Sequence, residues 1–410
     1  MKLKKPNAFS IISFFIIITL VFCKTVSAGN PIGETADSNY ILSNELSTTD
    51  NKMNISALES TAHTDKTSSS IWKSRKFKTQ IKGLSLGDVD GDRRNETVFI
   101  NGKKIFIYRY SSGRFEKIRE IQGKSYDNFI SVDVADINNN GKSEIFVTNL
   151  SGNNRLRSFV LEWNGTQFEK IIYNANWYYR ILNESSHGHN ILLGQKRGVN
   201  RIFFKGIYEL KWNKGKYAPA DRQIVPKWMN VYSFNYGDVL NNGQKVIIAF
   251  THDDYVRILD KDGQEEWTSS ERYGGSATYL EDFSESDSSK NKRTDDPKAM
   301  NRIYLPQRLH IVDLYKDGKK EVVVVRNVDA AGRVFARLRT FKSGHIECLI
   351  WDNFGLYQKW KTREISGHIS DYVIGDIDND GQDELVFSVV AKTGSVFGKA
   401  RSFIVSQGIN

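Results

Sequence analysis

A short acidic turn followed by an apolar strand recurs along this chain, and this repeat constrains the fold more than any other feature. Its five versions begin at Asp88, Asp136, Asp238, Asp313 and Asp376. The spacing between the second and third is about twice that between the first two, a gap that leaves room for one more unit. Residues 177–195 fill the gap with an aromatic strand, a turn and an apolar strand, but without the acids. The chain therefore contains six related units.

Each unit continues into two alternating strands joined by a short polar turn with glycine. Clear examples are KIFIYRYSSGRFEKI and RSFVLEWNGTQFEKI, and this pattern is typical of β-hairpins. Four strands in a repeat of roughly 40–50 residues indicate one blade of a β-propeller. We therefore predict an all-β fold, a β-propeller of four-stranded antiparallel blades with six blades. Seven blades would follow if residues 270–305 contain further strands.

The two ends of the repeat region predict how the propeller closes. The last unit ends with ARSFIVSQGIN, which matches the third strand of the second unit, so its fourth strand is missing. The stretch SIWKSRKFKTQI precedes the first acidic turn and parallels YQKWKTREISG, a fourth strand. We expect residues 71–80 to complete the last blade, since closure removes an open sheet edge.

The acidic turns have the donor pattern of a calcium site. Calcium takes six to eight oxygens at about 2.3–2.6 Å, and alternating positions of a tight turn face one way. Counting from the first aspartate, positions one, three, five and nine offer side chains, and position seven offers a backbone carbonyl. Gly381 at position six allows the bend. The donors of the last turn are Asp376, Asp378, Asp380, the carbonyl of Gln382, and Glu384.

Two further turns keep enough of this pattern to be predicted as calcium sites. The second turn offers Asp136, Asn138, Asn140, the carbonyl of Lys142, and Glu144. The first turn offers Asp88, Asp90, Asp92, the carbonyl of Arg94, and Glu96. In this first turn Arg93 replaces the bend glycine.

The remaining turns depart from the pattern. The turn at Asp313 keeps Asp317 and Glu321 but has Tyr315 at position three, so its metal binding is left open. The turn at Asp238 has apolar residues at two ligand positions and is not expected to bind calcium. An alternative for every turn is an Asx-rich loop that satisfies itself with hydrogen bonds and holds no metal.

The motif D-x-D-x-D-G-x-x-[DE] before an apolar strand resembles the FG-GAP/VCBS repeat of integrin α-subunit propellers and many secreted bacterial proteins. The resemblance covers residues 71–410. It implies a propeller with calcium (Ca²⁺) between the first two strands of a blade, and it implies no catalytic group. Because one scaffold serves many functions, the resemblance fixes no ligand.

The N-terminal segment has the features of a secretory signal. Three lysines precede an apolar core at residues 11–22, and Val26-Ser27-Ala28 forms a small-x-small cleavage site. We predict a signal peptide at residues 1–28, a disordered linker at 29–70, and a secreted or periplasmic, envelope-associated mature protein. Lipidation at Cys23 is the alternative, although Phe22 stands where a small residue is needed. Residues 281–298 are predicted as a surface insertion.

Charge and composition bear on the partner. Removing residues 1–28 removes four lysines and no acids, so the formal net charge of +10 falls to +6. The remaining basic residues are scattered, as on a soluble surface, although an anionic envelope surface could attract them. A nucleic-acid partner is not expected outside the cytoplasm, and we expect a monomer.

No convergent set of acid and base groups is apparent in the sequence, and His187 and His189 are the nearest candidates. We therefore predict a non-enzymatic module that binds a protein or a glycan. A propeller-based polysaccharide lyase or hydrolase, and a periplasmic scaffold for envelope assembly, are the alternatives. If sugars bind, the aromatic cluster Trp177-Tyr178-Tyr179 is the first stacking candidate.

Overall fold

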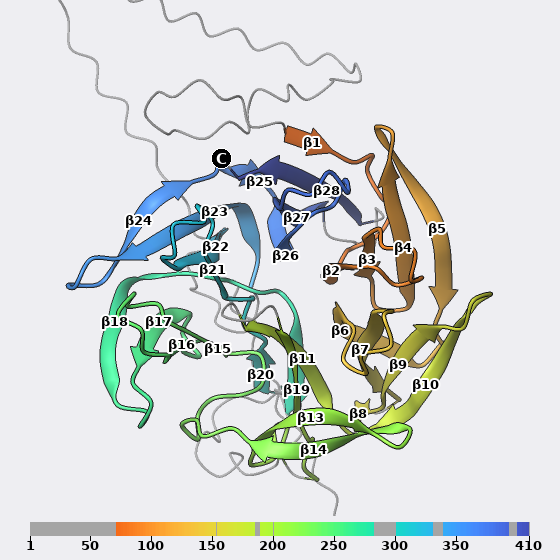
Figure 1. Cartoon of the computed structure of the whole chain (residues 1–410), viewed down its shortest axis with the longest axis horizontal. Helices are drawn as coiled ribbons and strands as arrows, with labels where there is room; N and C mark the ends of the chain where they lie inside the picture. The colour runs from red at the N-terminus through yellow and green to blue at the C-terminus, as the bar shows by residue number, and fades with distance from the viewer. Residues whose placement is uncertain are drawn as a thin grey trace, which may run out of the picture. The chain divides into compact units, whose positions relative to one another are not determined.

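The computed structural model describes residues 71–152, 154–184, 189–199, 201–282, 301–330, 339–392 and 400–409, whose regular structure is β strand. Six four-stranded antiparallel sheets stand around a common axis as the blades of a β-propeller (Figure 1). The predicted fold class and the count of six blades are confirmed. Within these ranges, no helix has the length and apolar character needed to span a membrane.

Several predictions fall outside the described residues. The predicted signal peptide at residues 1–28 and the predicted linker at 29–70 lie there entirely. Most of the predicted insertion at 281–298 lies there as well, apart from its first two residues. These assignments therefore remain predictions.

The first three blades follow one another along the chain, each with its strands in sequence order from the axis outwards. Blade 1 consists of β2 (Gly83–Gly87), β3 (Glu96–Ile100), β4 (Lys104–Ser111) and β5 (Arg114–Gln122). Blade 2 consists of β6 (Asp127–Ala135), β7 (Glu144–Ser151), β9 (Ser158–Trp163) and β10 (Phe168–Ala175), with the short β8 (Arg155–Leu156) beside β7. Blade 3 consists of β11 (Tyr178–Glu184), β12 (His189–Gln195), β13 (Ile207–Asn213) and β14 (Lys216–Arg222).

The other three blades repeat this order. Blade 4 consists of β15 (Phe234–Gly237), β16 (Val246–Phe250), β17 (Tyr255–Leu259) and β18 (Glu265–Arg272). Blade 5 consists of β21 (His310–Val312), β22 (Glu321–Asp329), β23 (Phe341–Trp351) and β24 (Leu356–Lys361), with β25 (Ile365–Ser366) beside β23. Blade 6 consists of β26 (His368–Gly375), β27 (Glu384–Lys392), β28 (Arg401–Gly408) and, as its outermost strand, β1 (Ile71–Lys73).

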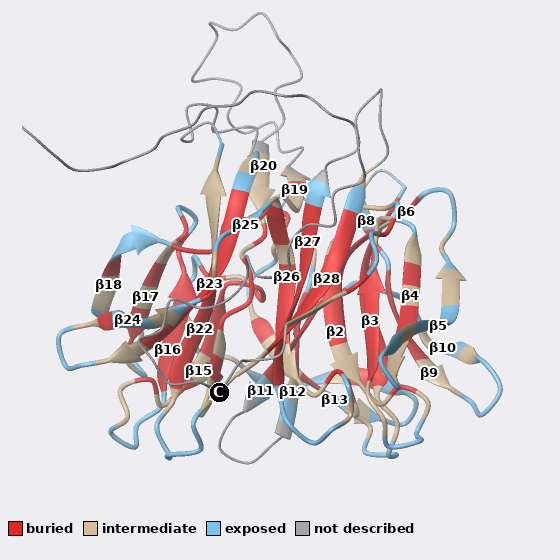
Figure 2. Ribbon diagram, turned by 90° about the horizontal axis from the view of Figure 1, so that it is seen from above, coloured by how far each residue is buried: buried red, intermediate tan, exposed pale blue. Residues whose placement is uncertain are grey.

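Packing between blades forms the core. Six clusters of buried hydrophobic side chains occur among the described residues, one between each pair of neighbouring blades. The second strand of a blade is covered on both faces, and every residue of β3, β7 and β16 is buried. This double coverage explains why the second strands read as continuous apolar runs in the sequence, while the outermost strands are largely exposed (Figure 2).

In blades 1 and 4 the first strand approaches its neighbour so closely that its last residue must be glycine. A Cβ added to Gly87 would lie 2.6 Å from Val134 of blade 2, and one added to Gly237 would lie 2.7 Å from Ile311 of blade 5. Both contacts are too short for a real side chain. The glycine before the acidic turn in these two blades therefore reflects the convergence of strands at the axis.

Residues 270–305 contain two strands but no additional blade. β19 (Tyr279–Asp282) pairs only with β20 (Asn301–Tyr304), as a two-stranded sheet between blades 4 and 5 of the sequence order. Leu280 of β19 is buried in the core cluster of blades 3 and 4. The alternative of seven blades is therefore not what the structure shows.

The aromatic cluster expected to stack on sugars is buried. Trp177, Tyr178 and Tyr179 are 9%, 0% and 1% exposed, and their rings pack in the cores on either side of blade 3. The prediction of this trio as a sugar platform is wrong, because strand alternation directs the rings into the blade interfaces.

The ring is closed as predicted. β1 pairs with β28 in antiparallel register, with Trp72 opposite Ser406, so residues 71–73 complete the last blade. Beyond β1, Phe77 and Ser402 exchange backbone hydrogen bonds of 2.7 and 3.0 Å. The Ser402 hydroxyl also donates to the carbonyl of Thr79 and accepts from the Ile81 amide. The Phe77 ring packs against Phe99 and Tyr108 of blade 1, so this segment joins blade 6 to blade 1.

We expect Phe77→Ala to destabilise the whole propeller, because Phe77 is 8% exposed and belongs to the interface between blades 6 and 1. Removing a buried phenylalanine ring typically costs about 3–5 kcal/mol. Thermal unfolding followed by circular dichroism measures the effect. Ile118→Ala is the control, since Ile118 is 42% exposed on the outermost strand of blade 1. An equal, small change in melting temperature for both variants would show that the contact between blades 6 and 1 at Phe77 does not stabilise the propeller.

Candidate metal centre

The acidic turns all connect the first and second strands of their blades. The blades are related by rotation about the axis, so the turns lie together on one face of the propeller. This is the lower face in Figure 2. Their backbones share one conformation. Position four has a positive φ in all five turns, from 54° at Asn241 and Lys316 to 81° at Gly91, and position six is also positive. Arg93 adopts a φ of 67° at position six, so the loss of the bend glycine does not change the loop.

The first aspartate of each turn caps the loop. Both carboxylate oxygens accept backbone N–H groups from the middle of the turn, at 3.1 and 2.9 Å for Asp376 and at 3.0 and 2.8 Å for Asp238. Asp88, Asp136 and Asp313 make equivalent pairs of bonds. The turn at Asp238 has no further acid and still has this geometry, so acids at positions three, five and nine are not needed to shape the loop.

The glutamate at position nine fixes the loop to the second strand. One carboxylate oxygen accepts the N–H of position two in four blades, over 2.8–3.1 Å, at Glu96, Glu144, Glu321 and Glu384. This bond leaves the other oxygen, Oε1, for a second partner. That partner differs from blade to blade, and it determines which turns still need a cation.

In blade 1 the second partner is an arginine from β4. The Arg109 guanidinium donates to Glu96 Oε1 at 2.5 Å, and its two terminal nitrogens lie 2.9 Å from Asp90 and 2.8 Å from Asp92. The carboxylates predicted as calcium ligands are thus brought together, with one ligand oxygen of Asp88, Asp90 and Glu96 mutually within 4.8 Å. A positive charge from the chain itself already contacts three of the predicted ligands.

In blade 2 an additional acid lies at the turn. Glu162 of β9 accepts the side-chain amides of Asn138 and Asn140, at 2.6 and 2.9 Å. Glu144 accepts the phenol O–H of Tyr217, which comes from β14 of blade 3. Burial raises the pKa of Glu144 to about 7. This turn therefore has three acids when Asp136 is included, and neutral side chains donate hydrogen bonds to two of them, Glu144 and Glu162.

In blade 5 a lysine supplies the cation. Lys359 of β24 lies 3.8 Å from Glu321 Oε1, and its ammonium sits 3.5 Å above the ring of Tyr315. The Tyr315 hydroxyl in turn accepts the indole N–H of Trp360 at 2.7 Å. The aromatic residue at position three therefore places a lysine, rather than an oxygen donor, at the turn.

In blade 6 no described side chain from the third or fourth strand bonds to the acids of the turn. The register places Glu384 of β27 opposite Gly408 of β28. One ligand oxygen each of Asp376, Asp378 and Glu384 lies within 4.8 Å of the others. Among the described residues, no lysine or arginine forms an ion pair with these three carboxylates. Asp380 and Gln382, the other predicted donors, lie on the same exposed turn, where the Gln382 N–H donates to Asp380 at 2.8 Å.

Electrostatic strain in this turn appears in its pKa values. The pKa of Glu384 is raised to about 7, chiefly by burial and in part by the neighbouring charges of Asp378, Asp380 and Asp376. Burial and the charge of Asp380 also raise the pKa of Asp378. A divalent cation bound by these oxygens would favour their ionised forms. The donors are all oxygens, which is the set that calcium prefers.

Sequence reasoning did not identify Arg109, Glu162, Lys359 or Gly408. These four residues lie on the third or fourth strand of their blades, beside the turn only because of strand pairing. The signal that could have found them is the register of the second and third strands, which the sequence repeat does not fix.

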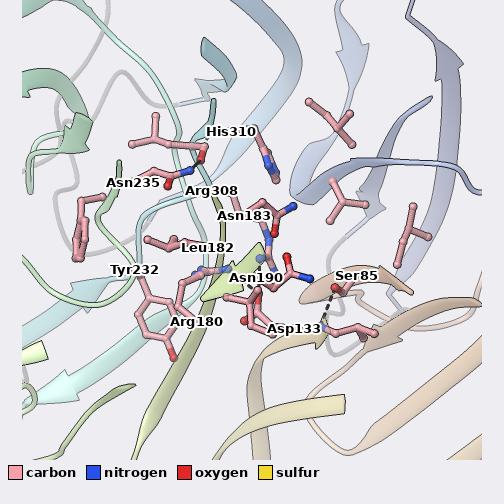
Figure 3. A pocket seen from close by; sticks show the side chains of 17 residues that line it. Ser85, Asp133, Arg180, Leu182, Asn183, Asn190, Tyr232, Asn235, Arg308 and His310 are labelled. Atoms are coloured by element: carbon pink, nitrogen blue, oxygen red, sulfur yellow. Dashed lines mark hydrogen bonds and ion pairs between the residues drawn. The ribbon is translucent and has the colours of Figure 1, made fainter. Parts of the chain in front are cut away.

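Other titratable groups gather at the axis, where a small cavity of about 140 Å³ lies between the first strands. Arg308 pairs there with Asp133 of blade 2 (Figure 3). It also pairs with Asp371 of blade 6 at 2.8 Å. Arg180 lies 3.5 Å from Asp133. Burial lowers the pKa of His310 to about 3, so this imidazole is neutral. Both acids are engaged by arginine. Of the histidine candidates, His187 lies outside the described residues and His189 begins β12.

Comparisons with known proteins concern the repeat and the fold. Residues 88–147 match the FG-GAP-like repeat family model. A comparison with curated proteins finds no matching sequence. Among solved structures, the BBS1N chain of a complex with ARL6DN has 9% identity and a TM-score of 0.43, with 84% of this chain and 98% of that chain covered.

Two further solved structures resemble the chain in outline. One is a putative oxidoreductase (glucose dehydrogenase) from Thermus thermophilus, with 10% identity, a TM-score of 0.41, and coverage of 82% and 99%. The other is a europium-containing methanol dehydrogenase, with 8% identity, a TM-score of 0.35, and coverage of 78% and 81%. At these scores the likenesses carry no inference about activity. The matched repeat and the six blades together support the resemblance of this chain to β-propellers built from FG-GAP-like repeats.

Proposed function

We propose that this protein is a non-catalytic binding propeller of the cell envelope or the extracellular space, stabilised by calcium in the turn of blade 6. The supporting observation is the cluster of Asp376, Asp378 and Glu384 opposite Gly408, with no cationic side chain paired to it among the described residues. The ion would neutralise carboxylates that otherwise repel one another, and it would tie the turn to β27. The role in binding rests on the predicted secretion and on the engagement of the axial acids by arginine.

We rank the three predicted turns by the partners of their acids. The turn of blade 6 has the strongest case. The turn of blade 2 comes second, since Glu162 adds a carboxylate but the asparagine amides now occupy it. In blade 1 the ion would compete with Arg109 for Asp90, Asp92 and Glu96, so we propose that this arginine replaces the calcium there.

Calcium addition should raise the melting temperature of the wild-type protein relative to the protein in chelator. Asp378→Asn should abolish this shift, because Asp378 would be a ligand of the ion and caps the turn with only one N–H bond, from Asp380, where Asp376 accepts two. The metal-free variant should be no less stable than metal-free wild type, since one repelling charge is gone. Differential scanning calorimetry in EGTA and in millimolar calcium measures both effects.

The matched control for this test is Asp238→Asn. Asp238 makes the same capping bonds in a turn without further acids, so its loss should lower stability equally with and without calcium. A calcium shift that survives Asp378→Asn, or no shift in wild type, would remove the metal from the proposal.

The calcium shift should also depend on pH. The pKa of Glu384 in the folded protein is raised from 4.5 to about 7. Protonation of Glu384 therefore contributes to the stability of the metal-free fold below pH 4.5, and this contribution to stability is lost as the pH rises through 7. Calcium binds the ionised carboxylate, so its stabilisation should be larger at pH 8 than at pH 5.5. Thermal melts at both pH values test this. Glu384→Gln keeps an acceptor for the Ile377 N–H and should flatten the dependence, whereas an equal shift at both pH values in wild type would oppose it.

Arg109→Gln should convert the turn of blade 1 into one that responds to calcium. Removing one partner of a buried ion pair costs about 3–5 kcal/mol, and Arg109 is 13% exposed at its side chain. We expect this loss in chelator and partial rescue by calcium, with one more ion bound per molecule in isothermal titration calorimetry. Equal destabilisation in both conditions, with unchanged stoichiometry, would show that the arginine does not stand in for a metal.

A further inference from the structure

A large groove lies on the propeller face opposite the acidic turns, between blades 3 and 4. Its walls come from the β12–β13 loop, the β14–β15 connection, the β16–β17 loop and residues of β20. Its volume is about 1210 Å³. Pockets for single small molecules usually measure about 300–1,000 Å³, so the groove has room for several units of a chain-like ligand.

The lining of the groove is strongly basic. Seven described arginines and lysines line it, against the two acids Asp253 and Asp254. Two of these arginines are paired, Arg339 with Asp254 at 2.9 Å and Arg257 with Glu265 at 3.3 Å. Four others are exposed and have no ion pair with any described residue: Arg201, Lys205, Arg222 and Lys227. The groove therefore holds positive charge that no described acid neutralises.

Aromatic rings are exposed between these charges. Phe204 is 54% exposed and Trp228 is 44% exposed, whereas the other aromatic residues of blade 3 are largely packed in its cores. The Arg257 guanidinium lies 5.8 Å from the Trp228 ring centre. Flat aromatic faces pack well against the apolar faces of sugar rings. Exposed rings beside unpaired cations suit a ligand with both apolar faces and negative charges.

We propose that this groove binds an acidic polysaccharide, with carboxylates of the polymer at the four unpaired cations and sugar rings on Trp228 and Phe204. The inference rests on the proposed function and names the partner class within it. Neutral polar side chains of the groove, among them Gln223, Asn230 and Ser270, match the hydroxyl groups that such a polymer carries.

The test measures binding of the full mature chain to hyaluronate and polygalacturonate, two polymers that carry uronic acids. Dextran serves as the neutral polymer and poly-dT as the nucleic acid. Measurements are made in EGTA, so that calcium does not cross-link the polymers, after circular dichroism confirms that the protein is folded. We expect binding to at least one uronate polymer that weakens as salt is added, and none to dextran.

Groove variants provide the decisive comparison. Arg222→Ser with Lys227→Ser should weaken uronate binding at least tenfold and reduce its salt dependence. Trp228→Ala should weaken binding while leaving the salt dependence unchanged. The matched control is Arg114→Ser with Lys216→Ser, two exposed cations on the hairpins of blades 1 and 3. These control changes should leave binding within twofold of wild type.

Three results would overturn the proposal. The first is that neither uronate polymer binds. The second is that the control variant weakens uronate binding as much as the groove variants do. The third is that poly-dT binds at least as tightly as the uronate polymers and that the groove variants abolish this binding. Equal binding of a neutral glycan or a protein to the wild type and to the groove variants would also overturn the assignment of the groove as the binding site. That last result would leave the proposed binding function intact, whereas catalytic turnover of a polysaccharide would remove the proposed function itself.

Discussion

The antiparallel pairing of β1 with β28 is the constraint on which the rest of the structure depends. A propeller blade buries its second strand only when both neighbours are present, so a gap in the ring would expose two faces at once. Here the segment from Trp72 to Ile81 joins the last blade and then leads directly into the first. Closing the ring in this way makes every interface internal, including the one that connects the two ends of the repeat region.

The acidic turns show how one loop conformation can be kept while its chemistry changes. The first aspartate and the positive-φ positions preserve the backbone in all five turns. The residue beside the position-nine glutamate then differs: an arginine in blade 1, a second acid in blade 2, and a glycine in blade 6. Neighbouring turns are also connected, because Asn379 accepts the Asn95 N–H and Asn241 accepts the Lys320 N–H. Stability at one turn therefore bears on the next.

Much of the fold could be predicted from the sequence because it depends on local patterns. Strand alternation, turn glycines and a repeated motif fix the blades, and the matching ends fix the closure. The counter-charges of the turns could not be predicted, since they depend on register: Glu162 of blade 2 aligns by sequence with Ser406, yet the residue paired with Glu384 is Gly408. The aromatic trio at 177–179 misled because exposure depends on which face of a strand meets a neighbour.

Arg308 has a consequence for how the propeller deforms. It lies just before β21 of blade 5 and binds acids from blades 2 and 6, so it spans the axis instead of following the rim. In a ring held together only by packing between neighbouring blades, a displacement of one blade acts only on the blades beside it. Arg308 connects blades across the axis instead, so displacing blade 5 acts directly on blade 2, which is not its neighbour in the ring. The groove between blades 3 and 4 therefore borders a frame that resists opening at its centre.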